Sequence, residues 1–478
     1  MQDNSNYGVA VLELSRAHPD RTAFRGAEVS VTLAQVASLM TRFAVNLKVR
    51  GVDASSSVVI LDPENHPRGL TLALACGLLG ARWVAYGKNM PFAALGTTHF
   101  MSIGSPPPEV SHPRTHVVDD SWSSYPASWD TSRPESFKGF SSSDDIALFV
   151  GTSGTTGSTK YVARSGRYLW DKIQSRSTAE YKLIHSRFPF TSAQGFRLAL
   201  GGLLQGSTLA IANDVAQLAK IGTEAVYASP NQVDGLCKDV QPLAHRISHL
   251  RVGGSMISKQ ALARWFGYFE RIEVSYGSRD GGGGGFALLS EPTDEITYAP
   301  YPGVEFEVVD VEQKPVRVGV VGEVRLKTPV TAHEYVGAPE ATAEVFRDGW
   351  FYPGDLGSLS ADGRLSIVGR TKDQFNIGGV KFNASAIDEA IAAVVGVEHA
   401  ASFTRQNAAG SAELAVLVVP AAGADFATTA AAIRMQCMGL GKTMVPRSIY
   451  FATVMPANAS GKVPRGDLPL FSAALPAY

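Results

Sequence analysis

Residues 145–160 read DIALFVGTSGTTGSTK. An apolar strand is predicted over 145–150, and the residues that follow it are almost all Gly, Ser or Thr up to a lysine. Glycines let a backbone turn its N–H groups inward, hydroxyls add donors and the lysine adds charge, so this order is typical of a cradle for phosphate oxygens. A flexible surface loop is the alternative interpretation, and the spacing is not that of a Walker A loop. The candidate phosphate-binding residues are Thr152, Ser153, Gly154, Thr155, Thr156, Gly157 and Lys160.

Helical and strand-like patterns alternate on both sides of this stretch. Apolar residues recur at helical spacing over 31–49, and the run 56–61 then has the composition of a buried strand. An apolar helix is predicted next, and more strands follow it. These elements span 70–81 for the helix and 81–86, 207–211 and 225–229 for the strands. The alternation indicates an α/β architecture with layered, largely parallel sheets. The Pro- and Ser-rich stretch 105–145 is predicted to be a surface connector.

The pattern of predicted elements changes after residue 297. Short alternating strands separated by Gly or Asp-Gly turns are predicted at 303–310, 322–328, 346–355 and 363–370, which indicates a β-rich subdomain. Beyond it, a helix at 384–397 and a strand at 413–419 indicate a small α+β unit. We therefore expect a large N-terminal domain, residues 1–370, of layered α/β subdomains plus the β-rich subdomain. A small, mobile α+β C-terminal domain, residues 371–478, would follow it.

Composition excludes several classes of function. The 478 residues predict roughly three structural units. Lys+Arg 43 balances Asp+Glu 44, so there is no charge excess for binding nucleic acid or anionic lipid. Three widely spaced cysteines exclude a disulfide framework and favour a reducing compartment, so we expect the cytoplasm. No apolar run is long enough to predict a membrane span.

Five further segments, taken together with the phosphate loop, carry a resemblance. They are VGGSMIS (252–258), YGSRD (276–280), YPGDLG (352–357), GRTKDQFNIGGVKF (369–382) and NASGKVPR (458–465). In content and order the chain resembles the adenylate-forming superfamily of acyl- and aryl-CoA synthetases, adenylation domains and luciferases. The resemblance implies a carboxylate that attacks the α-phosphorus of ATP, followed by displacement of AMP by a thiol. It also implies ATP, Mg²⁺ and coenzyme A as cofactors.

The same resemblance assigns the nucleotide site. Asp355 is expected to hold the ribose hydroxyls and Arg370 to contact ribose or phosphate. Tyr276 offers a flat face for adenine. The other expected contacts to the base and its surroundings come from Gly253, Gly254, Ser255, Gly277 and Ser278.

The chain departs from the family pattern directly after Tyr276. The family has Thr-Glu where this chain has Arg279 and Asp280. Asp280, with Thr152, remains a candidate ligand of Mg²⁺, although its side chain is one methylene shorter than glutamate. Arg279 either grips the α-phosphate or repels Mg²⁺, and we favour the grip because the other ATP motifs persist.

The C-terminal motifs imply a lid. Lys462 matches the lysine that bridges the substrate carboxylate and the α-phosphate. Lys372 matches the hinge about which the small domain rotates, after which Gly379 would line the approach of the thiol.

The acyl pocket is expected to include residues from three segments, namely Thr191, Phe196, Gly281, Gly282 and Phe286. The glycine run 281–285 would either open a deep acyl channel or form a mobile loop. The stretch 188–192 reads FPFTS and lacks an aspartate that could pair with an α-ammonium group, so α-amino acids are disfavoured. An apolar carboxylic acid, aryl or aliphatic, is the expected substrate.

Several alternatives stay open. Coenzyme A is the expected acceptor, but an acyl carrier protein or an amine would use the same adenylate. A degenerate binder that does not turn nucleotide over is a rival, prompted by Arg279 and Asp280. A zinc site is a weaker rival, because His245 and His249 lie four residues apart, on one face if the segment is helical, with no third ligand indicated. The protein is expected to be a monomer or a homodimer.

Overall fold

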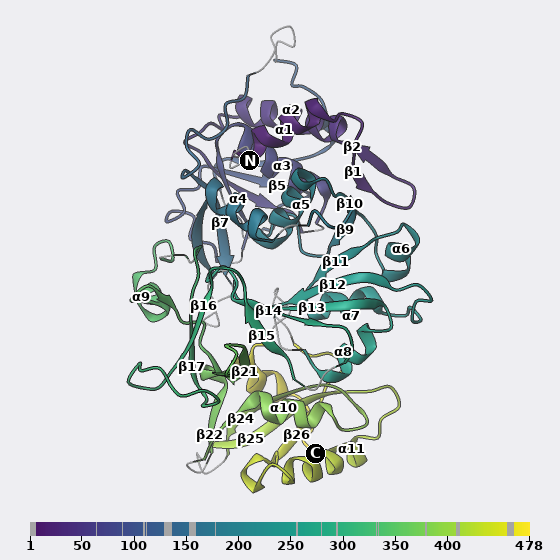
Figure 1. The fold of residues 1–478 in the computed structure, drawn as a ribbon, viewed down its shortest axis with the longest axis vertical. Helices are drawn as coiled ribbons and strands as arrows, with labels where there is room; N and C mark the ends of the chain where they lie inside the picture. Colours follow the sequence, from purple (N-terminus) through teal and green to yellow (C-terminus); the bar gives the residue numbers. More distant parts are fainter. Residues whose placement is uncertain are drawn as a thin grey trace.

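The computed structural model describes most of the chain. The described ranges are residues 6–63, 65–87, 89–108, 110, 112–128, 136–152, 159–176, 178–254, 257–278, 280–292, 295–330, 332, 334–377, 380–407, 412–456 and 463–478. The molecule is elongated, with the N-terminal helices at one end and the C-terminal segment at the other (Figure 1).

The N-terminal end holds a mostly parallel sheet in the order β6-β5-β3-β4-β7-β8. Only β8 runs antiparallel, because it returns directly from β7 as a hairpin. Its strands are β3 Ser57–Leu61, β4 Arg82–Ala85, β5 His99–Ser102, β6 Thr115–Val117, β7 Ile146–Thr152 and β8 Lys160–Ser165. The stretch 105–145 was expected to be a surface connector, but it contributes β6 and the side chain of Trp122, which is 1% exposed.

A larger sheet crosses the middle of the molecule. Its parallel part follows the order β13-β12-β11-β9-β10-β1, with β2 antiparallel at the edge. These strands are β1 Thr22–Arg25, β2 Ser30–Thr32, β9 Leu183–Ser186, β10 Thr208–Ala210, β11 Ala225–Ala228, β12 Ile247–Gly253 and β13 Phe269–Tyr276. The predicted alternation of helix and strand is therefore confirmed as an α/β architecture.

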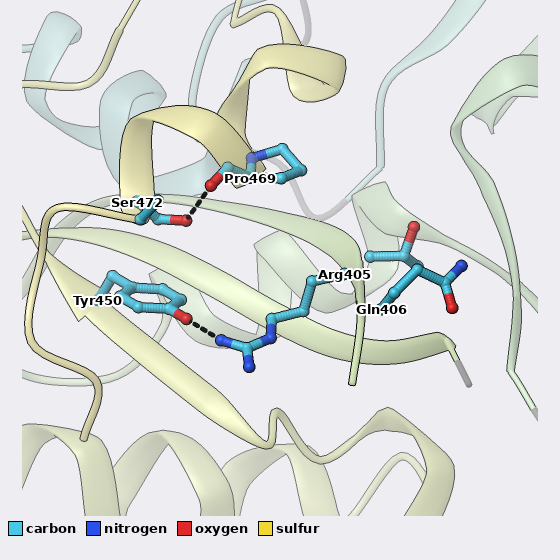
Figure 2. A pocket seen from close by; sticks show the side chains of 7 residues that line it. Arg405, Gln406, Tyr450, Pro469 and Ser472 are labelled. Atoms are coloured by element: carbon cyan, nitrogen blue, oxygen red, sulfur yellow. Dashed lines mark hydrogen bonds between the residues drawn. The ribbon is translucent and has the colours of Figure 1, made fainter. Parts of the chain in front are cut away.

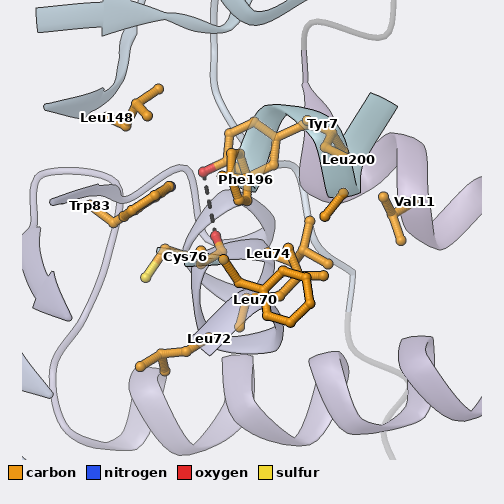
Figure 3. Packing of buried hydrophobic residues seen from close by; sticks show 14 of the residues in the cluster. Tyr7, Val11, Leu70, Leu72, Leu74, Cys76, Trp83, Leu148, Phe196 and Leu200 are labelled. Carbon is orange, nitrogen blue, oxygen red and sulfur yellow. Dashed lines mark hydrogen bonds between the residues drawn. The ribbon is translucent and has the colours of Figure 1, made fainter. Parts of the chain in front are cut away.

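The main hydrophobic core draws on both sheets and on the helices α1 Tyr7–Ala17, α2 Leu33–Val49, α3 Pro67–Leu78 and α5 Ala193–Gln205. Helix α3 is apolar on every face and buried from Gly69 to Leu78, as expected for a helix covered on all sides. Phe196 of α5 lies in this core, with its ring edge-on to the rings of Tyr7 and Trp83 at centroid distances of 5.2 and 4.9 Å (Figure 3). We expected Phe196 on the wall of the acyl pocket, but full burial between two aromatic rings makes it a core residue.

Three short helices cover the other face of the larger sheet. Their apolar side chains pack with β11, β12 and β13 into a second cluster. The helices are α6 Val215–Lys220, α7 Pro230–Cys237 and α8 Lys259–Trp265. Helix α4, Gly166–Ser175, follows β8 and packs against α5.

The larger sheet continues from β13 into antiparallel strands, which form the β-rich part predicted from the sequence. Their order is β13-β14-β15-β21-β20-β17-β19-β18, and β16 pairs with β17. These elements are β14 Gly285–Leu289, β15 Thr297–Pro300, β16 Glu305–Val309, β17 Gly322–Lys327, α9 Pro339–Val345, β18 Phe346–Arg347, β19 Trp350–Phe351, β20 Asp355–Leu359 and β21 Leu365–Arg370.

The residues after 373 build separate small cores. Two clusters contain only side chains from Phe375 onward, drawn from a three-stranded sheet and the helices on it. The elements are β22 Gln374–Ile377, β23 Val380–Asn383, α10 Ala384–Ala392, β24 Val397–Gln406, β25 Ala412–Pro420, α11 Phe426–Met438, β26 Ser448–Phe451 and α12 Leu468–Ser472. Among the described residues, no helix is long and apolar enough to cross a membrane.

Truncating Phe196 tests its placement in the core. We expect Phe196→Ala to lower the free energy of unfolding by about 3–5 kcal/mol, because it leaves a cavity between Tyr7 and Trp83. Phe471→Ala on α12 is the matched control, since that ring is 40% exposed. Denaturant unfolding measures both variants. An unchanged midpoint for Phe196→Ala would contradict the core assignment.

Candidate active site

The carboxyl ends of β12 and β13 lie side by side, which is where open α/β sheets bind ligands. Gly253 pairs with Ser275 in this parallel register. A Cβ on Gly253 would lie 2.7 Å from the Ser275 carbonyl oxygen, so only glycine allows the two strands to end this close together. The predicted nucleotide residues Gly253, Gly254 and Tyr276 are thereby brought to one edge of the sheet.

Three predicted nucleotide-binding residues form one cluster. Asp355 and Arg370 are opposite each other on β20 and β21, and the Arg370 Nε lies 3.3 Å from Asp355 Oδ1. The Tyr276 hydroxyl donates to Asp355 Oδ2 at 2.8 Å. Burial, and then the Asp355 carboxylate, raise the pKa of Tyr276, so it stays a neutral donor. Both carboxylate oxygens of Asp355 are thus positioned by neighbouring side chains.

The ends of the phosphate loop are held by a strand pair. Thr152 ends β7 and pairs with Lys160, which begins β8. Thr152 is buried, whereas Lys160 is partly exposed and its Nζ lies 5.2 Å from the centre of the Tyr335 ring. The loop between them therefore starts and ends beside Tyr335.

Tyr335 also contacts both candidate metal ligands. Its hydroxyl donates to Asp280 Oδ2 at 2.8 Å and is hydrogen-bonded to the Thr152 side chain. Burial, followed by the charge of Asp280, raises the pKa of Tyr335, so the hydroxyl keeps its proton. Sequence reasoning missed this residue, because an isolated tyrosine before a turn has no local signature.

The glycine run 281–285 is neither an open channel nor a loose loop, which corrects both expectations. All five glycines are buried. Neighbouring side chains fill the space that side chains at these positions would take: a Cβ on Gly281 would lie 2.5 Å from Phe351, and one on Gly283 2.1 Å from Arg176. Backbone hydrogen bonds from Gly282 to Ser278 and from Gly284 to Tyr276 close the segment into a compact turn.

The remaining predicted acyl residues are separated. Phe286 stacks on Tyr301 with ring centroids 5.2 Å apart. Thr191 is buried next to the first turn of α3, where its Cγ2 is 3.0 Å from the position a Cβ on Gly69 would occupy. Gly277 has a φ of +145°, and a Cβ there would lie 2.4 Å from Gly283, so the turn requires glycine at that position.

The hinge candidate Lys372 is exposed in a short 3₁₀ turn, Thr371–Asp373, between β21 and β22. Nearby, Arg465 pairs with Asp388, lies 3.6 Å from Asp373 and donates to the Ser402 carbonyl at 2.6 Å. This arginine anchors the described end of the NASGKVPR motif. Several predicted residues fall outside the described residues, namely Ser153, Gly154, Thr155, Thr156, Gly157, Ser255, Arg279, Gly379 and Lys462.

A hollow in the C-terminal segment carries one arginine, whose charge is already neutralised. It is lined by residues of β24, β26 and α12, including Arg405, Tyr450 and Ser472 (Figure 2). Arg405 bonds the Tyr450 hydroxyl and pairs with Glu413 at 3.0 Å. An arginine with a carboxylate partner has no charge left over for an anionic ligand.

The histidine pair does not share a helix face, as the zinc alternative required. His249 lies within β12, and its Nε2 is 3.6 Å from Glu273. In the described part of the chain, no group of three or more His, Cys, Asp or Glu side chains is arranged to hold a metal ion.

Removing the charge of Asp355 tests the nucleotide cluster. We expect Asp355→Asn to weaken ATP binding about 10-fold or more, because a charge-assisted hydrogen bond to the sugar becomes a neutral one. Asp362→Asn, in the exposed turn before β21, is the control. Calorimetric titration of both variants measures the effect, and equal affinities would exclude Asp355 from the nucleotide site.

Removing the Tyr335 hydroxyl tests its role in holding Asp280. We expect Tyr335→Phe to lower the Mg²⁺-dependent part of ATP affinity roughly 10-fold, the usual effect of losing a hydrogen bond to a charged group. Tyr268→Phe is the control, because the Tyr268 hydroxyl donates to the Val240 carbonyl outside this cluster. Titrations with and without Mg²⁺ separate the metal-dependent part, and a loss that is the same in both would contradict the assignment.

Comparison with known proteins shows what the chain is similar to. A family model for AMP-binding enzymes matches residues 102–336, which include the strand pair of the phosphate loop, Asp280 and Tyr335. The chain is 26% identical to a feruloyl-CoA synthase from an Amycolatopsis species, over 97% of this chain and 99% of that protein. It is also 26% identical to a medium/long-chain-fatty-acid–[acyl-carrier-protein] ligase of Mycobacterium tuberculosis, over 96% of this chain and 94% of that protein.

The fold resembles that of an amide bond synthetase from Marinactinospora thermotolerans, with a TM-score of 0.79, 21% identity and coverage of 98% of this chain and 99% of that one. The matched segment contains the residues that Tyr335 joins, and the likeness in sequence and fold extends over nearly the whole chain. The chain is similar to AMP-binding enzymes over residues 102–336 and to acid-activating ligases over nearly its whole length.

Proposed function

We propose that the protein activates a carboxylic acid with ATP and passes the acyl group to the thiol of coenzyme A. In the first step a carboxylate oxygen bonds the α-phosphorus and the bond to the β-phosphate breaks, giving an acyl-adenylate and pyrophosphate. In the second step the thiol sulfur bonds the acyl carbon, AMP leaves with the carboxylate oxygen, and the thiol proton is released.

One observation carries the proposal. Tyr335 joins Thr152, Lys160 and Asp280, while Tyr276, four residues before Asp280, reaches Asp355. The groups suited to phosphate come from the β7–β8 pair of the N-terminal sheet and those suited to a sugar from β13 and β20 of the larger sheet, and Tyr335 joins the first set to Asp280. Such preorganised groups stabilise charge that develops in a transition state.

The donor set suits Mg²⁺. Asp280 offers a carboxylate and Thr152 a hydroxyl, both hard oxygen ligands. These two residues would hold the cation, which when bound neutralises charge on the phosphate oxygens. The hydroxyl of Tyr335 fixes Asp280 Oδ2, so the shorter aspartate is positioned by a neighbour instead of by its own length.

The protein's own residues divide the work. Lys160 lies at the end of the phosphate loop and supplies charge near the phosphates. Arg370 and Tyr276 position Asp355 for the ribose. Segment 371–478 acts as a lid that carries Lys462 to the reacting carboxylate and, after turning about Lys372, admits the thiol.

The proposal for the acyl group and the acceptor is based on the activities named for the relatives. A feruloyl-CoA synthase and a fatty-acid ligase are consistent with an aryl or aliphatic acid. Coenzyme A is the proposed acceptor. A carrier protein is the acceptor named for the fatty-acid ligase, and an amide bond synthetase shares the fold, so a carrier thiol and an amine are the alternatives to compare with it.

Acid-dependent exchange of labelled pyrophosphate into ATP tests the first step. We expect exchange with at least one member of a panel of aryl and aliphatic acids, because the step is reversible. Adding coenzyme A, a carrier protein or an amine in turn then identifies the acceptor. Silence across a broad panel, with ATP still bound, would favour a binder that does not turn nucleotide over.

Lys462→Ala tests the lid. We expect it to lower adenylate formation by about 10² to 10³, the usual effect of removing one well-placed charge stabiliser, and to spare transfer from supplied acyl-adenylate to coenzyme A. Lys442→Ala, in another turn of the C-terminal segment, is the control. Equal loss of both half-reactions would refute a lid with two working positions.

A further inference from the structure

Three cations are gathered between α4, α5 and the glycine run. Lys172 and Arg176 lie four residues apart, so they share one face at the end of α4, and Arg197 enters from α5. The Lys172 Nζ donates to the Gly282 carbonyl, which Arg176 also approaches at 3.5 Å. We call Lys172, Arg176 and Arg197 the cation cluster.

Two members of the cluster are buried, Arg176 is half-buried, and none has an acidic partner among the described residues. Lys172 is 6% and Arg197 5% exposed. Among the described residues, no carboxylate pairs with or hydrogen-bonds to any of the three, and the NH2 group of Arg197 has no hydrogen-bond acceptor. The carboxylate of Glu273 is already used, since it forms an ion pair with Arg251, whose guanidinium nitrogens lie 2.8 Å from each of its oxygens.

Such an arrangement is costly in a free protein. Burying like charges together without a counter-ion is unfavourable, and the charged lysine responds by losing its proton. Burial, and then the charges of Arg176, Arg197 and Arg164, lower the pKa of Lys172 to about 6. By contrast, Arg405 in the C-terminal segment has its own glutamate. An unpaired buried cluster is a site that an anion would stabilise.

The cluster touches the expected acyl wall. Arg176 lies 4.0 Å from the centre of the Tyr301 ring, and the other contact of that ring is Phe286. Lys172 bonds the carbonyl of Gly282, in the compact glycine turn that precedes Phe286. Asp280 lies two residues before Gly282 and has contacts on both sides. Its carboxylate accepts from Tyr335 on the nucleotide side, and its backbone carbonyl accepts from Arg164 at 2.8 Å. The cations therefore contact the turn at Gly282, on the side opposite the contact between Asp280 and Tyr335.

We propose that the acid substrate carries a second anionic oxygen group, at the end of its acyl chain or ring, which the cation cluster binds. This inference rests on the proposed function and narrows its substrate class. The aromatic pair Phe286 and Tyr301 contacts the body of the acyl group, and the cluster selects for the distant charge. A carboxylate and an ionised phenol share this chemistry, and a test with both separates them.

Matched pairs of acids test the proposal in the pyrophosphate exchange assay. The probes are adipate against hexanoate, terephthalate against benzoate, and 4-hydroxybenzoate against benzoate. We expect kcat/KM for at least one doubly acidic probe to exceed its partner by about 10-fold or more, as for a charge-assisted contact. Whether a diacid or the phenol is favoured identifies the anionic group. Preference for the simple acid in every pair would overturn the proposal.

Two variants assign the preference to the cluster. Lys172→Met and Arg197→Met keep an unbranched side chain and remove the charge, and removing an uncompensated buried charge is often tolerated by the fold. We expect each to reduce the ratio of doubly acidic to simple acid use to about one. Arg167→Met is the control, because Arg167 is on the same helix but exposed and paired with Asp144. An equal loss for both acids would place the cluster at the reacting carboxylate or the nucleotide and overturn the proposal.

A binding measurement separates this inference from the proposed function. At about pH 7.5 Lys172 is mostly neutral, and an anion raises its pKa, so binding takes up a proton. Calorimetry of the favoured diacid in two buffers of different ionisation enthalpy should show this uptake in the native protein and its loss in Lys172→Met. If exchange fails with every acid but proton uptake persists, the proposed function fails and the anion site stands. Absence of binding and uptake with all doubly acidic probes refutes the anion site.

Discussion

The turn from Tyr276 to Gly284 is fixed from both sides, and both halves of the site depend on it. On one side the Tyr335 hydroxyl holds the carboxylate of Asp280. On the other, Arg164 bonds the carbonyl of Asp280 and Lys172 that of Gly282. Hydrogen bonds within the turn leave little room for it to flex, and an interior packed to this density transmits displacement. The turn therefore links the side chains behind Gly282 to the oxygen groups on the nucleotide side.

This arrangement places stability and function in opposition. A lysine and two arginines without a carboxylate would be replaced by apolar side chains if stability alone mattered. The folded state lowers the pKa of Lys172 from 10.5 to about 6, so between these pH values the unfolded chain binds the extra proton. Stability of the free protein therefore rises with pH across that window. A bound anion that raises the pKa of Lys172 weakens this dependence, which is the behaviour of a site shaped for its ligand and not for the empty state.

The sequence predicted local structure better than it predicted which side chains meet. Periodicity located α2, β3, α3, β21 and β25 because each has one apolar face or is buried throughout. It could not show that Phe351 and Arg176 fill the space beside the glycines, or that Phe196 lies between Tyr7 and Trp83, because these contacts join segments far apart in the chain. One signal was available and unused. Arg197 is the single charge in the apolar helix AQGFRLALGGLL, and an unexplained charge at a buried position often marks a site.

The net charge of the protein determines whether the cation cluster can attract an anion from a distance. A net charge of −1 provides no long-range attraction for an anion, so an acid reaches the pocket without steering. Buried charges are also screened much less by salt than exposed ones, whose influence fades within about 8 Å at physiological ionic strength. Discrimination by the cluster therefore occurs only after the acid has entered, through the difference between a paired and an unpaired buried charge. It should consequently persist at salt concentrations that abolish surface electrostatics, which distinguishes a built anion site from a basic patch.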